Sequence, residues 1–188
     1  MTVEPTPLAG QLLIALPALA DPNFARTAVL VCQHDGDGAM GLVVNRAAEY
    51  TLGDVLGQMG IECREDALGA HPVLAGGPVH PERGFVLHDG DGDWDSSLQI
   101  RPGLHVTTSR DVLEAIARGE GPERVAVALG CAGWGGGQLD FELTENSWLT
   151  APADGELLFT LPLEARWQAA AGRIGVDMQQ VAGYSGRA

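Results

Sequence analysis

Short apolar runs rich in β-forming residues recur along the first quarter of the chain. Two of them, residues 11–16 and 27–33, are separated by the turn-prone residues 20–23. The glycines of residues 34–38 permit a tight turn, after which residues 40–44 form a third run. This pattern predicts three buried strands, of which the last two form a hairpin.

Through the middle of the chain, segments whose apolar residues have helical spacing alternate with short apolar runs typical of strands. Thr51 and Asp54 form a capping pair ahead of apolar residues at helical spacing, which predicts a helix over 51–59. Ser109 is placed to cap a second helix over 110–117, and a third is expected over 138–145. The remaining apolar runs predict strands at 72–75, 84–88, 98–100, 104–108 and 125–129, and a glycine-rich loop at 130–137.

The last forty residues predict two short strands, 148–151 and 157–160, and a final helix over 163–171 with Pro162 at its first turn. No repeat, linker or shift in composition divides the chain. We therefore expect one α+β domain over residues 1–188, with loose termini at about 1–8 and 184–188. Its sheet is mixed and largely antiparallel, with a barrel-like form as one version, and about four short helices accompany it.

Composition narrows the classes of function. The chain has 188 residues, 45% of them hydrophobic, and a formal net charge of −14. It contains no lysine, and its 11 basic residues are arginines that are scattered along the chain. Lysine-based catalysis is therefore excluded, and the acidic charge disfavours nucleic acid as a partner. Three cysteines without CxxC spacing and no apolar segment of membrane-spanning length indicate a cytoplasmic protein.

Two segments resemble ligand-binding loops only in part. Residues 89–95 alternate aspartates as a calcium loop does, but Trp94 and Ile100 stand where that loop needs glycine and glutamate. The glycine-rich residues 130–137 lack the lysine and hydroxyl of a phosphate loop. The five histidines show no metal-binding spacing either. We therefore expect no metal and no cofactor.

An enzyme built on a pocket with His88, Ser109, Asp111 or Cys131 is an alternative. Cys131 can act as a nucleophile if a helix end lowers its pKa and a histidine serves as its base. The sequence does not pair these residues. The more common role of such a cysteine is that of a small buried apolar residue.

A series of short motifs runs in order through nearly the whole chain. They are Leu13–Phe24, Gly38–Asn45, Gly76–Val79, Arg83–His88, Thr108–Leu113, Ala128–Trp134, Gly137–Leu139, Asn146–Asp154, Arg166–Trp167 and Gly175–Asp177. Together these motifs resemble the YqgE/AlgH family of bacterial proteins. The resemblance implies a single α+β domain. It brings a transcriptional-regulator label with it, but it implies no catalytic residue.

Five residues in these motifs are the candidates for binding a ligand: Asn45, Arg83, His88, Arg110 and Trp134. Arginine pairs can grip a carboxylate, and a tryptophan can line a pocket. The leading hypothesis is a cytosolic binding or regulatory protein that acts on an unknown protein or small molecule. An undiscovered enzyme and a DNA-binding regulator are the alternatives, and the acidic charge disfavours the second.

Overall fold

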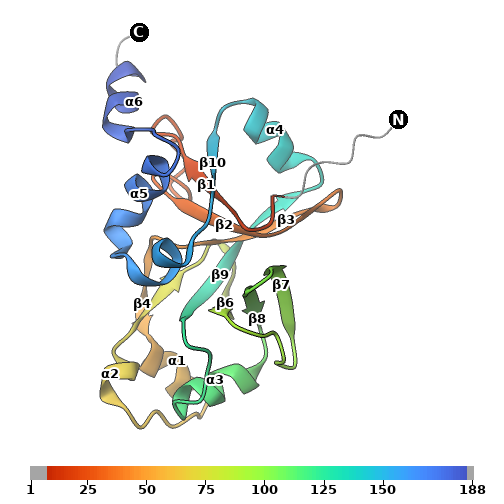
Figure 1. Cartoon of the computed structure of the whole chain (residues 1–188), viewed down its shortest axis with the longest axis vertical. Helices are drawn as coiled ribbons and strands as arrows, with labels where there is room; N and C mark the ends of the chain where they lie inside the picture. Colours follow the sequence, from red (N-terminus) through yellow and green to blue (C-terminus); the bar gives the residue numbers. More distant parts are fainter. Residues whose placement is uncertain (1–7, 186–188) are drawn as a thin grey trace.

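The computed structural model describes residues 8–185, which form a mixed sheet flanked by short helices (Figure 1). The strands are β1 (Gln11–Ala15), β2 (Ala28–Asp35), β3 (Gly38–Val43), β4 (Ala47–Thr51), β5 (Pro72–Ala75), β6 (Val79–Asp89), β7 (Ser97–Arg101), β8 (Leu104–Thr107), β9 (Val125–Gly135) and β10 (Trp148–Pro152). The α-helices are α1 (Leu52–Gln58), α2 (Asp66–Gly69), α3 (Arg110–Ala117), α4 (Gln138–Thr144), α5 (Arg166–Gly172) and α6 (Met178–Ser185). Two further turns of helix are η1 (Glu156–Thr160) and η2 (Leu163–Ala165).

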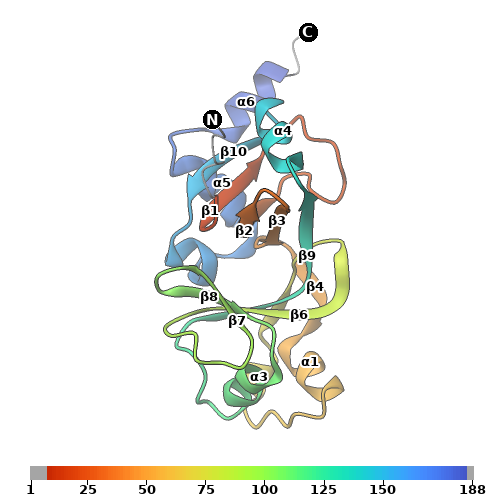
Figure 2. The same cartoon turned by 90° about the vertical axis from the view of Figure 1, so that its right-hand side faces the viewer.

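Strand β9 joins the two halves of the sheet. The order is β10-β1-β2-β3-β9-β6-β8-β7, and the antiparallel pair β4 and β5 joins this path where β5 runs parallel to β9. Along one edge of β9, β3 pairs with its C-terminal half and β5 with its N-terminal half. The sheet curls into a half-barrel (Figure 2), which confirms the α+β class and the largely antiparallel sheet.

Successive side chains of a strand point to opposite faces of the sheet, so the buried residues form separate core clusters. Leu12 and Ile14 of β1 face a central cluster inside the curl, whereas Leu13 and Ala15 face a second cluster beneath α4. Val86 of β6 belongs to a third cluster, which packs the other half of the sheet against α1 and α3. Helices α1, α2 and α3 thus lie at one end of the molecule, and α4, α5 and α6 lie at the other (Figure 1).

The expected loop at residues 130–137 is wrong, because strand β9 continues through Gly135. Its glycines serve close backbone packing within the sheet. A Cβ on Gly130, which has a φ of +78°, would collide with the carbonyl oxygen of Gly77. Gly76 and Gly77 therefore lie against the backbone of residues 130–131 because they carry no side chains, and Gly130 has none on the facing strand.

The expected strand at 157–160 is also wrong, because residues 156–160 form a turn of π-helix. The Asp154 carboxylate accepts the Leu157 N–H at 2.9 Å, which starts this turn. The buried Arg166 guanidinium then donates to the carbonyls of Val44, Leu158 and Leu161 at 2.9–3.0 Å. Of these contacts, the one with Val44 joins residues 122 positions apart. The helical turn therefore depends on contacts that the local strand-like sequence does not contain.

The expected helix over 163–171 is present as η2 followed by α5. Helices α2 and α6 and strand β4 were not expected from the sequence. Of the loose termini expected at about 1–8 and 184–188, residues 1–7 and 186–188 lie outside the described residues, whereas residues 184–185 belong to α6. No helix in this described part of the chain has both the length and the apolar character to cross a membrane.

Candidate functional site

A wide bulge in β6 creates the site. Val79 pairs with Cys131 and Gly84 pairs with Leu129, so residues 80–83 stand opposite Gly130 alone. His80 takes a positive φ of 47° within this segment, a conformation that is uncommon for a residue with a side chain. Residues 80–83 therefore project from the sheet, and we call them the β6 bulge.

The first cavity lies between the β6 bulge, α1 and the start of α3, and we call it the helix-side cavity. It has a volume of about 590 Å³, within the range of small-molecule sites. Its apolar lining consists of Val55, Met59, Leu113, Val127 and Leu129. Its polar lining consists of Tyr50, Asp54, Gln58, Glu82, Arg83, Thr108, Ser109 and Arg110.

The second cavity lies on the other side of the β6 bulge, toward the inside of the curled sheet. We call it the sheet-side cavity, and its volume is about 400 Å³. Its apolar lining consists of Met40, Val79, Phe85, Leu98, Val106, Cys131 and Gly133. His80, Arg83, Ser96, Ser97 and Thr108 complete it.

Arg83 borders both cavities, and so does Thr108. The Arg83 guanidinium lies 5.5 Å from the centre of the Phe85 ring and is exposed. Among residues 8–185 no carboxylate or hydrogen-bond acceptor pairs with it. This cation is therefore open to a ligand from either cavity.

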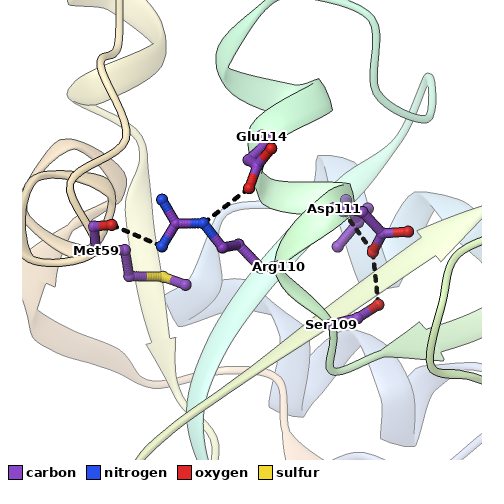
Figure 3. Close-up of polar contacts among 6 residues, drawn as sticks. Met59, Ser109, Arg110, Asp111 and Glu114 are labelled. Carbon is purple, nitrogen blue, oxygen red and sulfur yellow. Dashed lines mark hydrogen bonds and ion pairs between the residues drawn. The ribbon is translucent and has the colours of Figure 1, made fainter.

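Arg110 lines the helix-side cavity and contacts two neighbouring elements. Figure 3 shows its contacts with Met59 and Glu114. Its Nη1 donates to the Met59 carbonyl at the end of α1 at 2.7 Å, and its Nε pairs with Glu114 at 2.7 Å. A cation at the C-terminal end of a helix is favourable. Arg110 thus ties α1 to α3, and its charge is partly neutralised.

Ser109 and Asp111 fix the start of α3. The Ser109 hydroxyl donates to the Asp111 carboxylate at 2.6 Å (Figure 3) and accepts the Ser96 N–H at 3.0 Å. Partial burial raises the pKa of Asp111, but hydrogen bonds from Ser109 and from the N–H groups of Asp95 and Val112 outweigh it and hold the pKa below its ordinary value. Both side chains are therefore occupied in holding the loop before α3.

Asn45 and Trp134 lie away from both cavities. The Asn45 amide accepts the Ala28 N–H at 3.0 Å and donates to the Arg26 carbonyl at 2.8 Å, so it joins two backbone segments. Trp134 is buried beneath α4, and its indole N–H and that of Trp148 share one oxygen of Glu142. The structure brings Arg83 and Arg110 together at one cavity, but it does not bring Asn45 or Trp134 there.

His88 is fully buried on β6 and borders neither cavity. Its Nδ1 donates to the Asp89 carbonyl at 2.8 Å, because a carbonyl oxygen can only accept. In the neutral ring Nε2 then accepts the Thr107 hydroxyl at 2.7 Å, and Thr107 in turn accepts the hydroxyl of Ser97 at 2.6 Å. Burial lowers the pKa of His88 and favours this neutral form.

The residues of the enzyme alternative do not form a catalytic set within residues 8–185. Burial raises the pKa of the Cys131 thiol, against a smaller opposite effect of the Arg83 charge. Ser109 donates its proton to Asp111, and His88 donates and accepts at partners outside this group. In the same described residues no group of three or more His, Cys, Asp or Glu side chains is placed to hold a metal ion.

Sequence reasoning identified both arginines of the site but not their surroundings. Tyr50, Val55 and Leu113 lie on separate elements, and their meeting depends on how α1 and α3 pack on the sheet. The sequence does contain one indication of the β6 bulge. Pro81 stands just before the predicted strand 84–88, and a proline next to a strand favours an edge, a strand start or a bulge.

Comparisons with known proteins agree with the fold and the motifs. The family model described as AlgH-like matches residues 12–179. A UPF0301 protein from Xanthomonas campestris pv. campestris is 64% identical and one from Xanthomonas axonopodis pv. citri is 65% identical, each over the full length of both chains.

Solved structures give the same result. The solution structure of the AlgH protein from Pseudomonas aeruginosa is 44% identical, covers all of both chains and has a TM-score of 0.81. A crystal structure from Corynebacterium diphtheriae, at 18% identity, shares the fold with a TM-score of 0.76 over 96% of this chain and 94% of its own. The names of these relatives state no reaction. The resemblance found in the motifs is thereby confirmed, and the chain belongs to the AlgH-like (UPF0301) family of bacterial proteins.

Proposed function

We propose that this chain is a non-enzymatic binding protein of the bacterial cytosol that takes a small organic anion with an apolar body into the helix-side cavity. One observation carries the proposal: the exposed Arg83 guanidinium, which has no ion pair within residues 8–185, borders a cavity of about 590 Å³ with an apolar wall. The apolar lining would hold the body of the ligand, and Arg83 would meet its charge.

The charge of the chain limits the size of this ligand. With a net charge of −14, the surface as a whole repels a polyanion such as duplex DNA. A ligand with one negative group experiences far less of this repulsion and needs only one local cation. The proposal therefore favours a small molecule over the DNA-binding alternative.

Benzyl methyl phosphate is a suitable probe, because it carries one negative charge and one apolar group. We expect it to bind in an NMR titration, with shifts of backbone amides in α1, α3 and the β6 bulge. The uncharged benzyl dimethyl phosphate should bind about tenfold more weakly, because it has no negative charge to form an ion pair with the Arg83 guanidinium.

Two variants locate the binding. Arg83→Gln should weaken binding of the charged probe about tenfold and leave the uncharged one unchanged. Arg118→Gln is the matched control, since Arg118 is exposed, pairs with Glu120 and borders neither cavity. Equal affinities for the two probes, or equal effects of the two variants, would refute the proposal. A new ³¹P signal on prolonged incubation would favour the enzyme alternative.

A further inference from the structure

The helix-side and sheet-side cavities meet at the β6 bulge. Arg83 and Thr108 belong to the lining of both, so each of these side chains can contact a ligand in either cavity. Each cavity has its own apolar wall, formed by Leu113 and Leu129 on one side and by Phe85 and Val106 on the other. A single cation thus stands between two apolar compartments.

We infer that the two cavities form one bipartite site, whose ligand is an anion with an apolar group on each side of its charge. This inference rests on the proposed function and specifies its ligand. The anionic centre, such as a phosphodiester, lies at Arg83 on the β6 bulge. One apolar arm enters the helix-side cavity, and the other enters the sheet-side cavity.

The other groups at the bulge are compatible with this arrangement. The Asp54 carboxylate accepts the Thr51 N–H at 2.9 Å in the cap of α1, which directs it toward the helix end. Thr108 donates to the Ser96 hydroxyl at 3.2 Å, so the hydroxyls near Arg83 are neutral partners. Glu82 is exposed and is the remaining carboxylate in the lining of the helix-side cavity. The lining of the helix-side cavity therefore holds two carboxylates, of which Asp54 is held in the cap of α1 and Glu82 is the neighbour of Arg83 in the chain.

Two glycines are positions at which a larger side chain would fill one cavity without entering the other. A Cβ on Gly84, in the lining of the helix-side cavity, would meet nothing within 4 Å. A Cβ on Gly133, in the lining of the sheet-side cavity, would meet only Val79 at 3.6 Å, an ordinary contact. Neither glycine has a positive φ, so valine fits the strand at both positions. Gly84→Val and Gly133→Val are thus a matched pair of blocking variants.

The experiment compares dibenzyl phosphate with benzyl methyl phosphate, which have the same charge and differ by one apolar arm. We expect wild type to bind the two-armed probe about tenfold more tightly, because a second aromatic group is buried. Gly133→Val should remove this tenfold advantage and leave the binding of the one-armed probe unchanged. Gly84→Val should weaken both probes. Thermal unfolding of each variant checks that it is folded.

The outcomes separate this inference from the proposed function. Equal binding of the two probes by wild type, or an advantage that survives Gly133→Val, overturns the bipartite site and leaves the helix-side cavity as a simple site. Failure of the one-armed probe to respond to Arg83→Gln overturns the proposed function itself. Amide shifts of Val106 and Gly133 that appear with the two-armed probe and not with the one-armed probe give independent support.

Discussion

Protonation of His88 should make the stability of the fold depend on pH. The ring is fully buried, its Nε2 must accept the Thr107 hydroxyl, and the ring of His105 stacks on it with centroids 5.7 Å apart. Burial lowers the pKa of His88 below its ordinary value of 6.5, and His105 adds to this effect. The unfolded chain therefore binds a proton at a higher pH than the folded chain does.

The sign and the size of the effect follow from this difference. Above about pH 6.5 the ring is neutral in both states, and its contribution to the free energy of unfolding is constant. As the pH falls below that value, the unfolded state gains the proton first and stability decreases. The loss has an upper limit of about 1.4 kcal/mol for each pH unit below 6.5, which is the effect of one proton bound by the unfolded state alone.

Urea unfolding followed by tryptophan fluorescence at several pH values measures this loss. His88→Gln should reduce the slope, because glutamine can donate to Asp89 and accept from Thr107 without titrating. His71→Gln, at an exposed position, should leave the slope unchanged. Identical slopes for wild type and His88→Gln would refute the reasoning. An NMR titration of the His88 ring in wild type, which needs no variant, should give a pKa below 6.5.

Three further predictions concern the fold and the site. Arg166→Leu should lower the free energy of unfolding in urea by about 3 kcal/mol or more, because buried carbonyls lose a charged donor, whereas Arg118→Leu at an exposed position should change it by less than about 0.5 kcal/mol. Gly130→Ala should cost more than about 2 kcal/mol in the same assay, and Gly119→Ala only about 1 kcal/mol, because both have φ near +77° but only Gly130 also meets a backbone carbonyl. Glu82→Gln should tighten benzyl methyl phosphate about threefold in the NMR titration, since it removes a like charge from the cavity, and unchanged or weaker binding would contradict the position assigned to the anion.

The local signals in the sequence predicted the elements that local chemistry determines. Thr51 and Asp54 form the capping box expected at the start of α1, with both hydrogen bonds present. Ser109 begins α3 as expected, although its hydroxyl bonds to Asp111 instead of capping the helix backbone. The first strands were found from their continuous apolar runs, because both faces of a strand such as β1 pack against a core cluster.

Long-range contacts determined the elements that were misread. The glycines of residues 130–135 resemble a loop in sequence, yet β3 pairs with Ala132–Gly135 and makes a strand of them. The helical turn at 156–160 depends on Arg166, whose three carbonyl partners include one 122 positions away. The candidate site shows the same difference between local signals and long-range contacts. Its two arginines were candidates by residue type, but the β6 bulge that places Arg83 between two cavities depends on pairing across the sheet.

The place of Arg83 beside two cavities is what makes its charge informative. The chain has 25 aspartates and glutamates for 11 arginines, so an exposed guanidinium has many carboxylates available to it. Among residues 8–185, Arg110, Arg118 and Arg173 each pair with a carboxylate, whereas Arg83 and the exposed Arg64 do not. Of these last two, only Arg83 borders the helix-side and sheet-side cavities. Arg83 lies on a bulge that close glycine packing at residues 76–77 and 130 makes possible, and there it faces cavities instead of a partner. The same glycines that misled the prediction of a loop therefore help to place Arg83 between two cavities, where no carboxylate of residues 8–185 pairs with it.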